Sequence, residues 1–192
     1  MQIIDAIFNV ALLGACGYGF YALTPADNPY AYTAVAFCFV HALLMLVRSF
    51  TDDEEQEDCT RSLAVSTSIA DVLPLPLANI EFYSKSSQPG PALVHGMSVI
   101  LLLYDTMGNL GGDYDSATDT VKDLSVLGNV ASAVYCGFNE ENYFHVGIGV
   151  AAAVARFGAP LIGKFLPELT NSIDTIGKAA IIGLMTYGLT QP

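Results

Sequence analysis

Charged side chains are scarce in this sequence. Asp, Glu, Lys and Arg make up 14% of the 192 residues, whereas a soluble globular domain carries about 25%. So little charge cannot cover a water-facing surface. A soluble all-helical bundle is left as the minor alternative, because the buried helices of such bundles are typically only about 10 to 14 residues long.

Basic residues are rarer still. The chain has 7 Lys and Arg against 19 Asp and Glu, which gives a formal net charge of −12. This balance disfavours nucleic acid and anionic lipid surfaces as electrostatic partners and favours cations or basic proteins. Acidic residues gather at 52–58 and 113–123. We expect solvated loops there, because Thr118 stands where a calcium loop would need glycine.

Motifs for catalysis and for nucleotide or metal binding are also missing. The sequence has no Gly-rich loop ending in Lys-Ser/Thr, no Gly-x-Ser-x-Gly, no His-Glu-x-x-His and no cysteine pair at metal spacing. Cys16, Cys38 and Cys136 fall inside apolar segments, so the cysteines form no disulfide framework. We therefore predict a protein that is not an enzyme and that needs no cofactor and no metal. An enzyme acting on lipids through dispersed residues is a remote alternative.

Long uncharged apolar runs are what the sequence does contain. Residues 6–26, 28–47 and 86–104 include no Asp, Glu, Lys or Arg, and each run approaches the ~20 residues of a membrane-spanning helix. The predicted fold is all-α: a polytopic integral membrane bundle of six or seven transmembrane helices arranged as hairpins, in one domain over 1–192. Apolar runs bounded by turn residues and charges place the helices at about 3–23, 30–47, 63–83, 92–110, 124–138, 143–163 and 173–189.

The fifth and seventh segments are the least regular. Residues 124–138 are few for a full crossing, and Asp174 and Lys178 stand in the first turns of the seventh segment. The seventh segment therefore either spans the membrane or dips into its interface. This is why the prediction is six or seven helices.

Orientation follows from the few basic residues, since short cytoplasmic loops are enriched in Lys and Arg. One side of the predicted bundle holds Lys85 alone. The other side holds Arg48, Arg61, Lys122, Arg156 and Lys164. We predict a cytoplasmic N-terminus, and a C-terminus outside if the seventh segment spans.

Small residues recur at every fourth position in two segments. Such stripes allow close approach of helices in lipid, where apolar side chains gain nothing by leaving water. They serve either self-association and docking on another membrane protein or packing within this one bundle. The two stripes are Ala11, Ala15 and Gly19, and Gly147, Ala151 and Ala155.

Asp71 is the ionisable residue of greatest interest at apparent membrane depth, because Pro74 and Pro76 follow it and should break its helix. A carboxylate beside an interrupted helix is an arrangement that some carriers use for an ion or proton. Alternatively, Asp71 neutralises Arg156, or it is protonated against Ser66 or Thr67.

Four other polar residues lie at similar depth. Asp105 is close to the end of its segment and should mark the membrane interface. His41 and His95 lack metal-ligand partners at helical spacing, and we read them as hydrogen-bonded or interfacial. His145 is the third histidine at this depth.

Two functions remain open. The first is a non-catalytic structural or accessory subunit, or a self-associating scaffold, whose partners are the lipid bilayer and other membrane subunits or further copies of the chain. The second is a small carrier or channel for a cation, proton or polar solute. Asp71, Pro74, Pro76, Asp105, Arg156 and His95 are its candidate polar-core residues.

Overall fold

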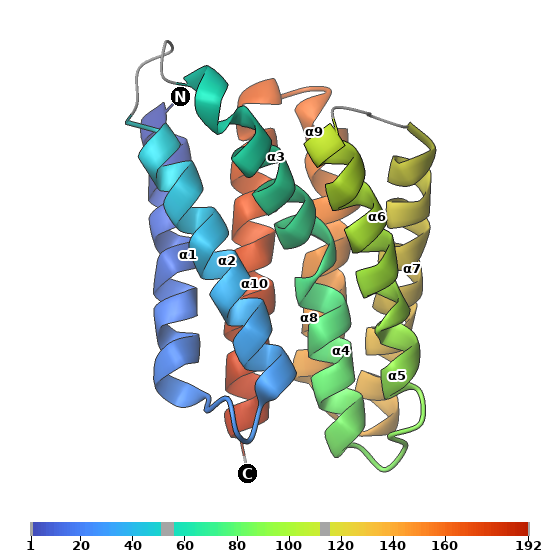
Figure 1. Cartoon of the computed structure of the whole chain (residues 1–192). Helices are drawn as coiled ribbons and strands as arrows, with labels where there is room; N and C mark the ends of the chain where they lie inside the picture. Colours follow the sequence, from blue (N-terminus) through green and yellow to red (C-terminus); the bar gives the residue numbers. More distant parts are fainter. Residues whose placement is uncertain (1, 51–55, 112–115, 192) are drawn as a thin grey trace.

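The computed structural model describes residues 2–50, 56–111 and 116–191 (Figure 1). Apart from short turns, these residues form seven long helical segments that lie side by side in one bundle. Segment by segment, the elements are α1 (Gln2–Ala22); α2 (Pro29–Arg48); α3 (Gln56–Val72) with α4 (Pro74–Lys85); α5 (Ala92–His95) with α6 (Met97–Gly111); α7 (Ser116–Asn139); α8 (Tyr143–Ala153) with a π-helical turn η2 (Val154–Gly158) and α9 (Ala159–Gly163); and, after a short turn η3 (Pro167–Leu169), α10 (Thr170–Thr190).

The segments alternate in direction, and the two ends of the chain lie at opposite ends of the bundle (Figure 1). We call the end that holds the N-terminus the N-terminal end. α10 has 21 residues, which at 1.5 Å per residue is about 31 Å, long enough to cross a bilayer. α7 begins at Ser116 and has 24 residues, so it is not the short helix over 124–138 that hydrophobicity suggested. Its first turns contain charged residues, so a search for apolar runs does not recognise them as part of the helix.

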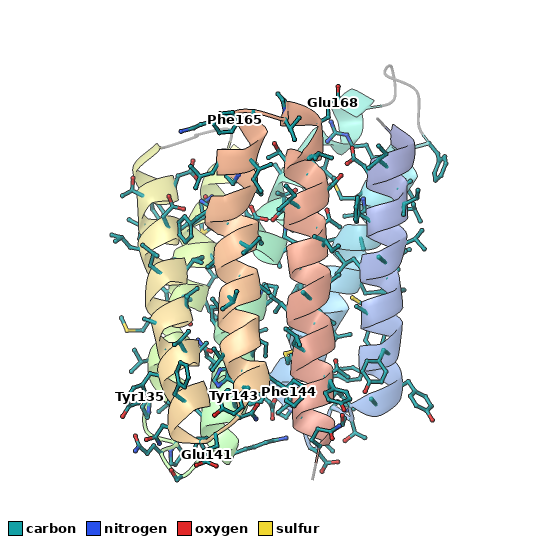
Figure 2. All side chains as sticks on the ribbon, turned by 180° about the vertical axis from the view of Figure 1, so that it is seen from behind. Tyr135, Glu141, Tyr143, Phe144, Phe165 and Glu168 are labelled. Atoms are coloured by element: carbon teal, nitrogen blue, oxygen red, sulfur yellow. The ribbon has the colours of Figure 1, made fainter. Side chains whose placement is uncertain are left out.

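Four of the helices are long and apolar enough to cross a membrane: Ile4–Ala22, Pro29–Arg48, Ser62–Lys85 and Tyr143–Gly163. Their outward surfaces are apolar, as the 61% exposure of Ile7 and the 58% exposure of Leu161 illustrate. Exposed aromatic residues flank this surface, with Tyr143 at one end and Phe165 at the other (Figure 2). Tyrosine favours the membrane interface in this way. Length, composition and surface thus describe a multi-pass membrane protein.

The segment formed by α3 and α4 is the central one. In its most apolar stretch of 18 residues, 72% of the residues are buried, against 28 to 33% in the corresponding stretches of the other three candidate spans. Every residue from Pro74 to Tyr83 is buried. The helix is broken at Leu73, and α4 restarts with Pro74, a first-turn position that suits proline. Because Pro74 has no N–H, the carbonyl of Ala70 loses its usual helical donor at the break.

The second small-residue stripe packs within the bundle. A Cβ atom added to Gly147 would lie 3.1 Å from a methyl of Leu184, and one added to Gly177 would lie 2.6 Å from the Cβ of Ala155 and 3.2 Å from the carbonyl oxygen of Ala151. These contacts join α8 and η2 to α10. In the first stripe, Gly19 packs closely against Val35: an added Cβ atom would lie 2.7 Å from a methyl of that side chain. Ala15 is half-buried and Ala11 is exposed.

Gly177→Ala is expected to destabilise the bundle by about 1–3 kcal/mol, because its methyl group would overlap Ala155 and force α10 away from α8. Gly183→Ala is the matched control on the same helix, since no atom lies within 4 Å of the added methyl group. That control should be neutral or slightly stabilising. Thermal unfolding in detergent compares the two; equal midpoints would refute the close contact.

Candidate functional site

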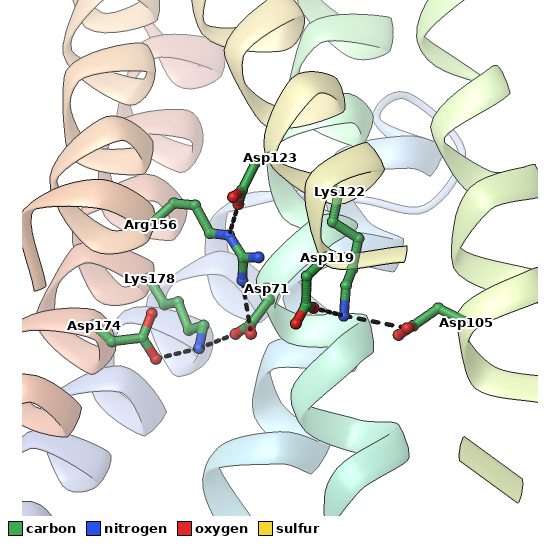
Figure 3. Close-up of polar contacts among 8 residues, drawn as sticks. All are labelled: Asp71, Asp105, Asp119, Lys122, Asp123, Arg156, Asp174 and Lys178. Atoms are coloured by element: carbon green, nitrogen blue, oxygen red, sulfur yellow. Dashed lines mark hydrogen bonds and ion pairs between the residues drawn. The ribbon is translucent and has the colours of Figure 1, made fainter. Parts of the chain in front are cut away.

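Five ionisable side chains meet inside the bundle near the break in the central helix (Figure 3). Lys178 Nζ lies 2.6 Å from Asp71 Oδ1 and also contacts the Asp174 carboxylate. Arg156 Nε donates a 2.7 Å hydrogen bond to Asp123 Oδ1, and its Nη1 lies 3.7 Å from Asp71 Oδ2. We call these five residues the ionic cluster. They come from α3, α7, η2 and α10, which lie far apart in the sequence.

The ionic cluster lies well inside the ends of its helices. From the N-terminal end, Asp71 is about 13 Å along Ser62–Lys85, Lys178 about 12 Å along α10 and Asp123 about 10 Å along α7, at 1.5 Å per residue. If all these helices cross a bilayer whose core is about 30 Å thick, the three residues lie at hydrocarbon depth. Lys178 is the most deeply buried, with 3% of its side chain exposed, and an unpaired ammonium group there would be costly.

The backbone on both sides of the cluster departs from regular α-helix. Asp71 lies two residues before the break at Leu73, and Arg156 lies in the π-helical turn η2. Pro160 has no N–H to offer the carbonyl of Arg156, and the N–H of Ala159 bonds to the carbonyl of Val154, five residues back. Turns of this kind are frequent at functional sites.

Asp71 is not needed to neutralise either cation of the cluster. Lys178 has its own carboxylate in Asp174, and Arg156 has its own in Asp123. Asp71 lies between the two cations and pairs with both. With every group ionised, three carboxylates face two cations, so the cluster carries a net charge of −1.

A cavity of about 20 Å³ adjoins these charges, and apolar side chains of the central segment and its neighbours also line it. This volume holds about one water molecule. Asp71, Arg156, Asp174 and Lys178 all line it, together with Ala70 and Pro74 at the helix break. Pro74 thus belongs to the site, whereas Pro76 is buried two residues further into α4 and does not line the cavity.

A second group of charges lies beside the first. Lys122 Nζ is 3.1 Å from Asp105 Oδ1 and 3.0 Å from Asp119 Oδ1 (Figure 3). Asp105 is buried, with 9% of its surface exposed. The ion pair with Lys122 lets it lie inside the bundle. Its expected role as a marker of the membrane interface stays a prediction. The acidic run 52–58, together with Asp113 and Asp115, lies outside the residues whose side chains the structure describes.

Residues 25–189 match the family model described as "Domain of unknown function (DUF4791)". The chain belongs to this family. The match runs from the turn before α2 to the end of α10 and includes all the charged residues of both groups. The comparison with curated proteins gave no match, and neither did the comparison with solved structures.

A network of neutral polar groups occupies the opposite half of this DUF4791 bundle, and Asn129 of α7 is its centre. The Asn129 amide nitrogen donates to the carbonyl oxygen of Ser125 at 2.8 Å and to Ser98 Oγ at 3.1 Å. Its Oδ1 accepts from Asn79 Nδ2 at 3.0 Å and lies 2.7 Å from His95 Nδ1. Because Oδ1 can only accept, His95 carries its proton on Nδ1.

The remaining bonds of this network follow from that assignment. His95 Nε2 accepts from Ser132 Oγ at 3.1 Å, and Tyr83 OH lies 2.8 Å from the same oxygen. On the far side, Asn79 Oδ1 lies 2.8 Å from Nε2 of His145, which stacks on Phe82. His95 is thus hydrogen-bonded, and it is not part of the ionic cluster.

The structure also shows which side chains Asp71 contacts. Arg156 is a partner of Asp71, as one sequence interpretation had it, but Lys178 is the nearer one. Ser66 is engaged elsewhere, since its hydroxyl donates to the carbonyl of Leu63 and its oxygen lies 3.2 Å from His41 Nδ1. His41 is therefore hydrogen-bonded as expected.

Sequence reasoning missed several members of these sites. Asp174 and Lys178 were read only as a reason to doubt the seventh helix, although their spacing of four residues is that of a self-neutralising helical pair. Glu81 was missed altogether. It is 2% exposed, and its Oε2 accepts from the backbone N–H groups of Tyr30 and Ala31 at the start of α2, where a helix has N–H groups without helical partners.

Proposed function

We propose that this protein is a small membrane carrier for a proton or a monovalent cation, and that Asp71 is the group that binds it. All seven helical segments cross the membrane in this proposal, and the N-terminal end faces the cytoplasm. The observation that carries the proposal is that Asp71 is a third carboxylate beside two cations. Lys178 and Arg156 are each neutralised by another carboxylate, so stability alone does not require a third acid at this depth.

Binding at Asp71 would change contacts between three helices. A proton or cation on this carboxylate competes with Lys178 and Arg156, and so weakens the link from α3 to α10 and to η2. The helix break and the π-helical turn lie beside these contacts and can accommodate a movement of one segment against another. The cavity holds only about one water molecule, and in this proposal the arrangement is a closed state of the carrier.

The charges nearest the N-terminal end would serve the same function. Asp123 and Asp119 are 44% and 38% exposed, and the whole chain is strongly acidic. A negative potential at the opening raises the local concentration of cations. Together with the surplus carboxylate, this favours protons or cations over anions as the transported species.

Asp71→Asn is expected to abolish flux while leaving the fold intact, because the pairs Lys178–Asp174 and Arg156–Asp123 remain neutral without it. The measurement is uptake into vesicles that contain the purified protein and a pH-sensitive dye, with Na⁺ or K⁺ gradients in parallel. Asp27→Asn is the control, since Asp27 is exposed and bonds only locally with Thr24. Flux in Asp71→Asn equal to that of the wild type would eliminate Asp71 as the site.

A packed structural or accessory subunit is the second candidate, favoured by the smallness of the cavity. Thiol labelling separates the two functions. Asp71→Cys, in a chain without its four native cysteines, is exposed in sealed vesicles to a membrane-impermeant reagent from either side. Labelling supports the carrier and shows which end is open. Protection from both sides, without measurable flux in the wild type, would leave the structural subunit as the function.

A further inference from the structure

An open groove runs along the outer surface between the α5–α6 segment and α7, away from the ionic cluster. Its volume is about 490 Å³, within the range of sites for small organic molecules. The walls are apolar and exposed: Val94 and Met97 are each 64% exposed on one side, and Leu124 is 63% exposed on the other. The groove opens to the surface that would face lipid.

The floor of this groove is polar, which is unusual for a lipid-facing surface. It consists of His95, Ser98, Ser125, Asn129 and Ser132, which belong to the network centred on Asn129. Ser98 is about 9 Å along its segment from Ala92, at 1.5 Å per residue. Its hydroxyl is therefore at hydrocarbon depth, where water is not available to complete hydrogen bonds.

One hydroxyl hydrogen in the floor has no hydrogen-bond acceptor among the described residues. Ser98 Oγ accepts from Asn129 Nδ2, and the hydroxyls of Ser98 and Ser125 share a single bond of 2.9 Å. Two hydroxyl groups have two hydrogens, and that bond uses only one of them. The structure gives the second hydrogen no acceptor among the described residues, so the pair has one O–H to offer a bound molecule.

The space in front of this donor is open. Gly128 lies on the groove between Ser125 and Asn129, and a Cβ atom added there would meet no atom within 4 Å. A side chain at this position would fill the groove instead of entering the protein core. Glycine thus leaves room for a ligand chain to approach the polar floor closely.

We infer that this groove binds an uncharged, lipid-soluble molecule with a long apolar body and a single hydroxyl or carbonyl oxygen, which accepts a hydrogen bond from the Ser98–Ser125 pair. The apolar walls match the body, and the one unused donor matches one acceptor oxygen. A phospholipid head group does not fit, because its charge would lie at hydrocarbon depth. The inference stands on the groove alone and does not depend on transport through the ionic cluster.

The test uses a matched pair of photoreactive probes, a diazirine-bearing hexadecanol and the corresponding diazirine-bearing hexadecane. Each is added to the full-length protein in lipid nanodiscs, and crosslinked peptides are identified by mass spectrometry. The alcohol should label residues 94–101 and 121–132 roughly fivefold more than the alkane, the gain expected from one net hydrogen bond. Excess unlabelled hexadecanol should compete. Equal labelling by both probes would show only general lipid contact and overturn the inference.

Three variants locate the site. Ser125→Ala should keep the preference for the alcohol, because Ser98 then has the free hydrogen, whereas Ser98→Ala with Ser125→Ala should remove it. Gly128→Leu should displace both probes from the groove, and Gly14→Leu, at an equally open position on α1, should not. Unchanged labelling in Gly128→Leu would overturn the inference. So would a dimer in the wild type that Gly128→Leu dissociates, since the groove would then belong to a second copy of the chain.

Discussion

Lys178→Met is expected to lower the free energy of unfolding by about 3–5 kcal/mol, because it removes the buried cation that Asp71 and Asp174 share. Only Asp71 keeps a second cation, Arg156. Lys178 is 2% exposed, and its removal leaves Asp71 and Asp174 facing each other inside the bundle. Methionine keeps the length and apolar stem of the side chain, so the loss reports on charge and not on volume. The measurement is reversible unfolding by sodium dodecyl sulfate in mixed micelles.

Two further variants test the cause of that loss. Adding Asp71→Asn to Lys178→Met should recover most of the stability. The double variant keeps only Asp174, which is the more exposed of the two carboxylates and is therefore better solvated. Lys164→Met, at an exposed position at the N-terminal end, should not change stability measurably. If Lys178→Met were as stable as the wild type, the cluster would be solvated rather than buried, and the pairing would have no structural role.

Asn129→Leu is expected to cost about 2–4 kcal/mol, because it removes the acceptor of the buried His95 Nδ1 and one of the two acceptors of Asn79 Nδ2. The second acceptor of Asn79 Nδ2, the backbone carbonyl oxygen of residue 129, remains. Leucine has a similar size, so overpacking contributes little. Asn139→Leu is the matched control: it lies on the same helix at an exposed position and should have no comparable effect. Unfolding in detergent measures both variants.

A double-mutant cycle with Asn79→Leu separates the bond from the packing. Replacing both amides by apolar side chains removes the partners together, so the double variant should lose less than the sum of the two single losses. Strict additivity would mean that the two amides do not interact, and that the arrangement of the network around Asn129 is incorrect.

The sequence predicted the course of the backbone well, for a simple physical reason. In a membrane, the length of an uncharged apolar run has to match the bilayer, and proline removes a helical donor wherever it occurs. The helices at Gln2–Ala22 and Pro29–Arg48 and the break before Pro74 could therefore be read from local sequence. The start of α7 could not, because Asp119, Lys122 and Asp123 resemble a loop until their partners are known.

The sequence alone determined that this chain is apolar, helical and interrupted at Pro74, because those properties depend on residues that are neighbours along the chain. Only the tertiary structure decided that Asp71 meets Lys178, that Asp105 is buried with Lys122 and that His95 donates to Asn129. Each of these pairs joins different helices. The energy of a buried charge or amide depends on the group it faces across the bundle, and periodicity along one helix carries no information about that group.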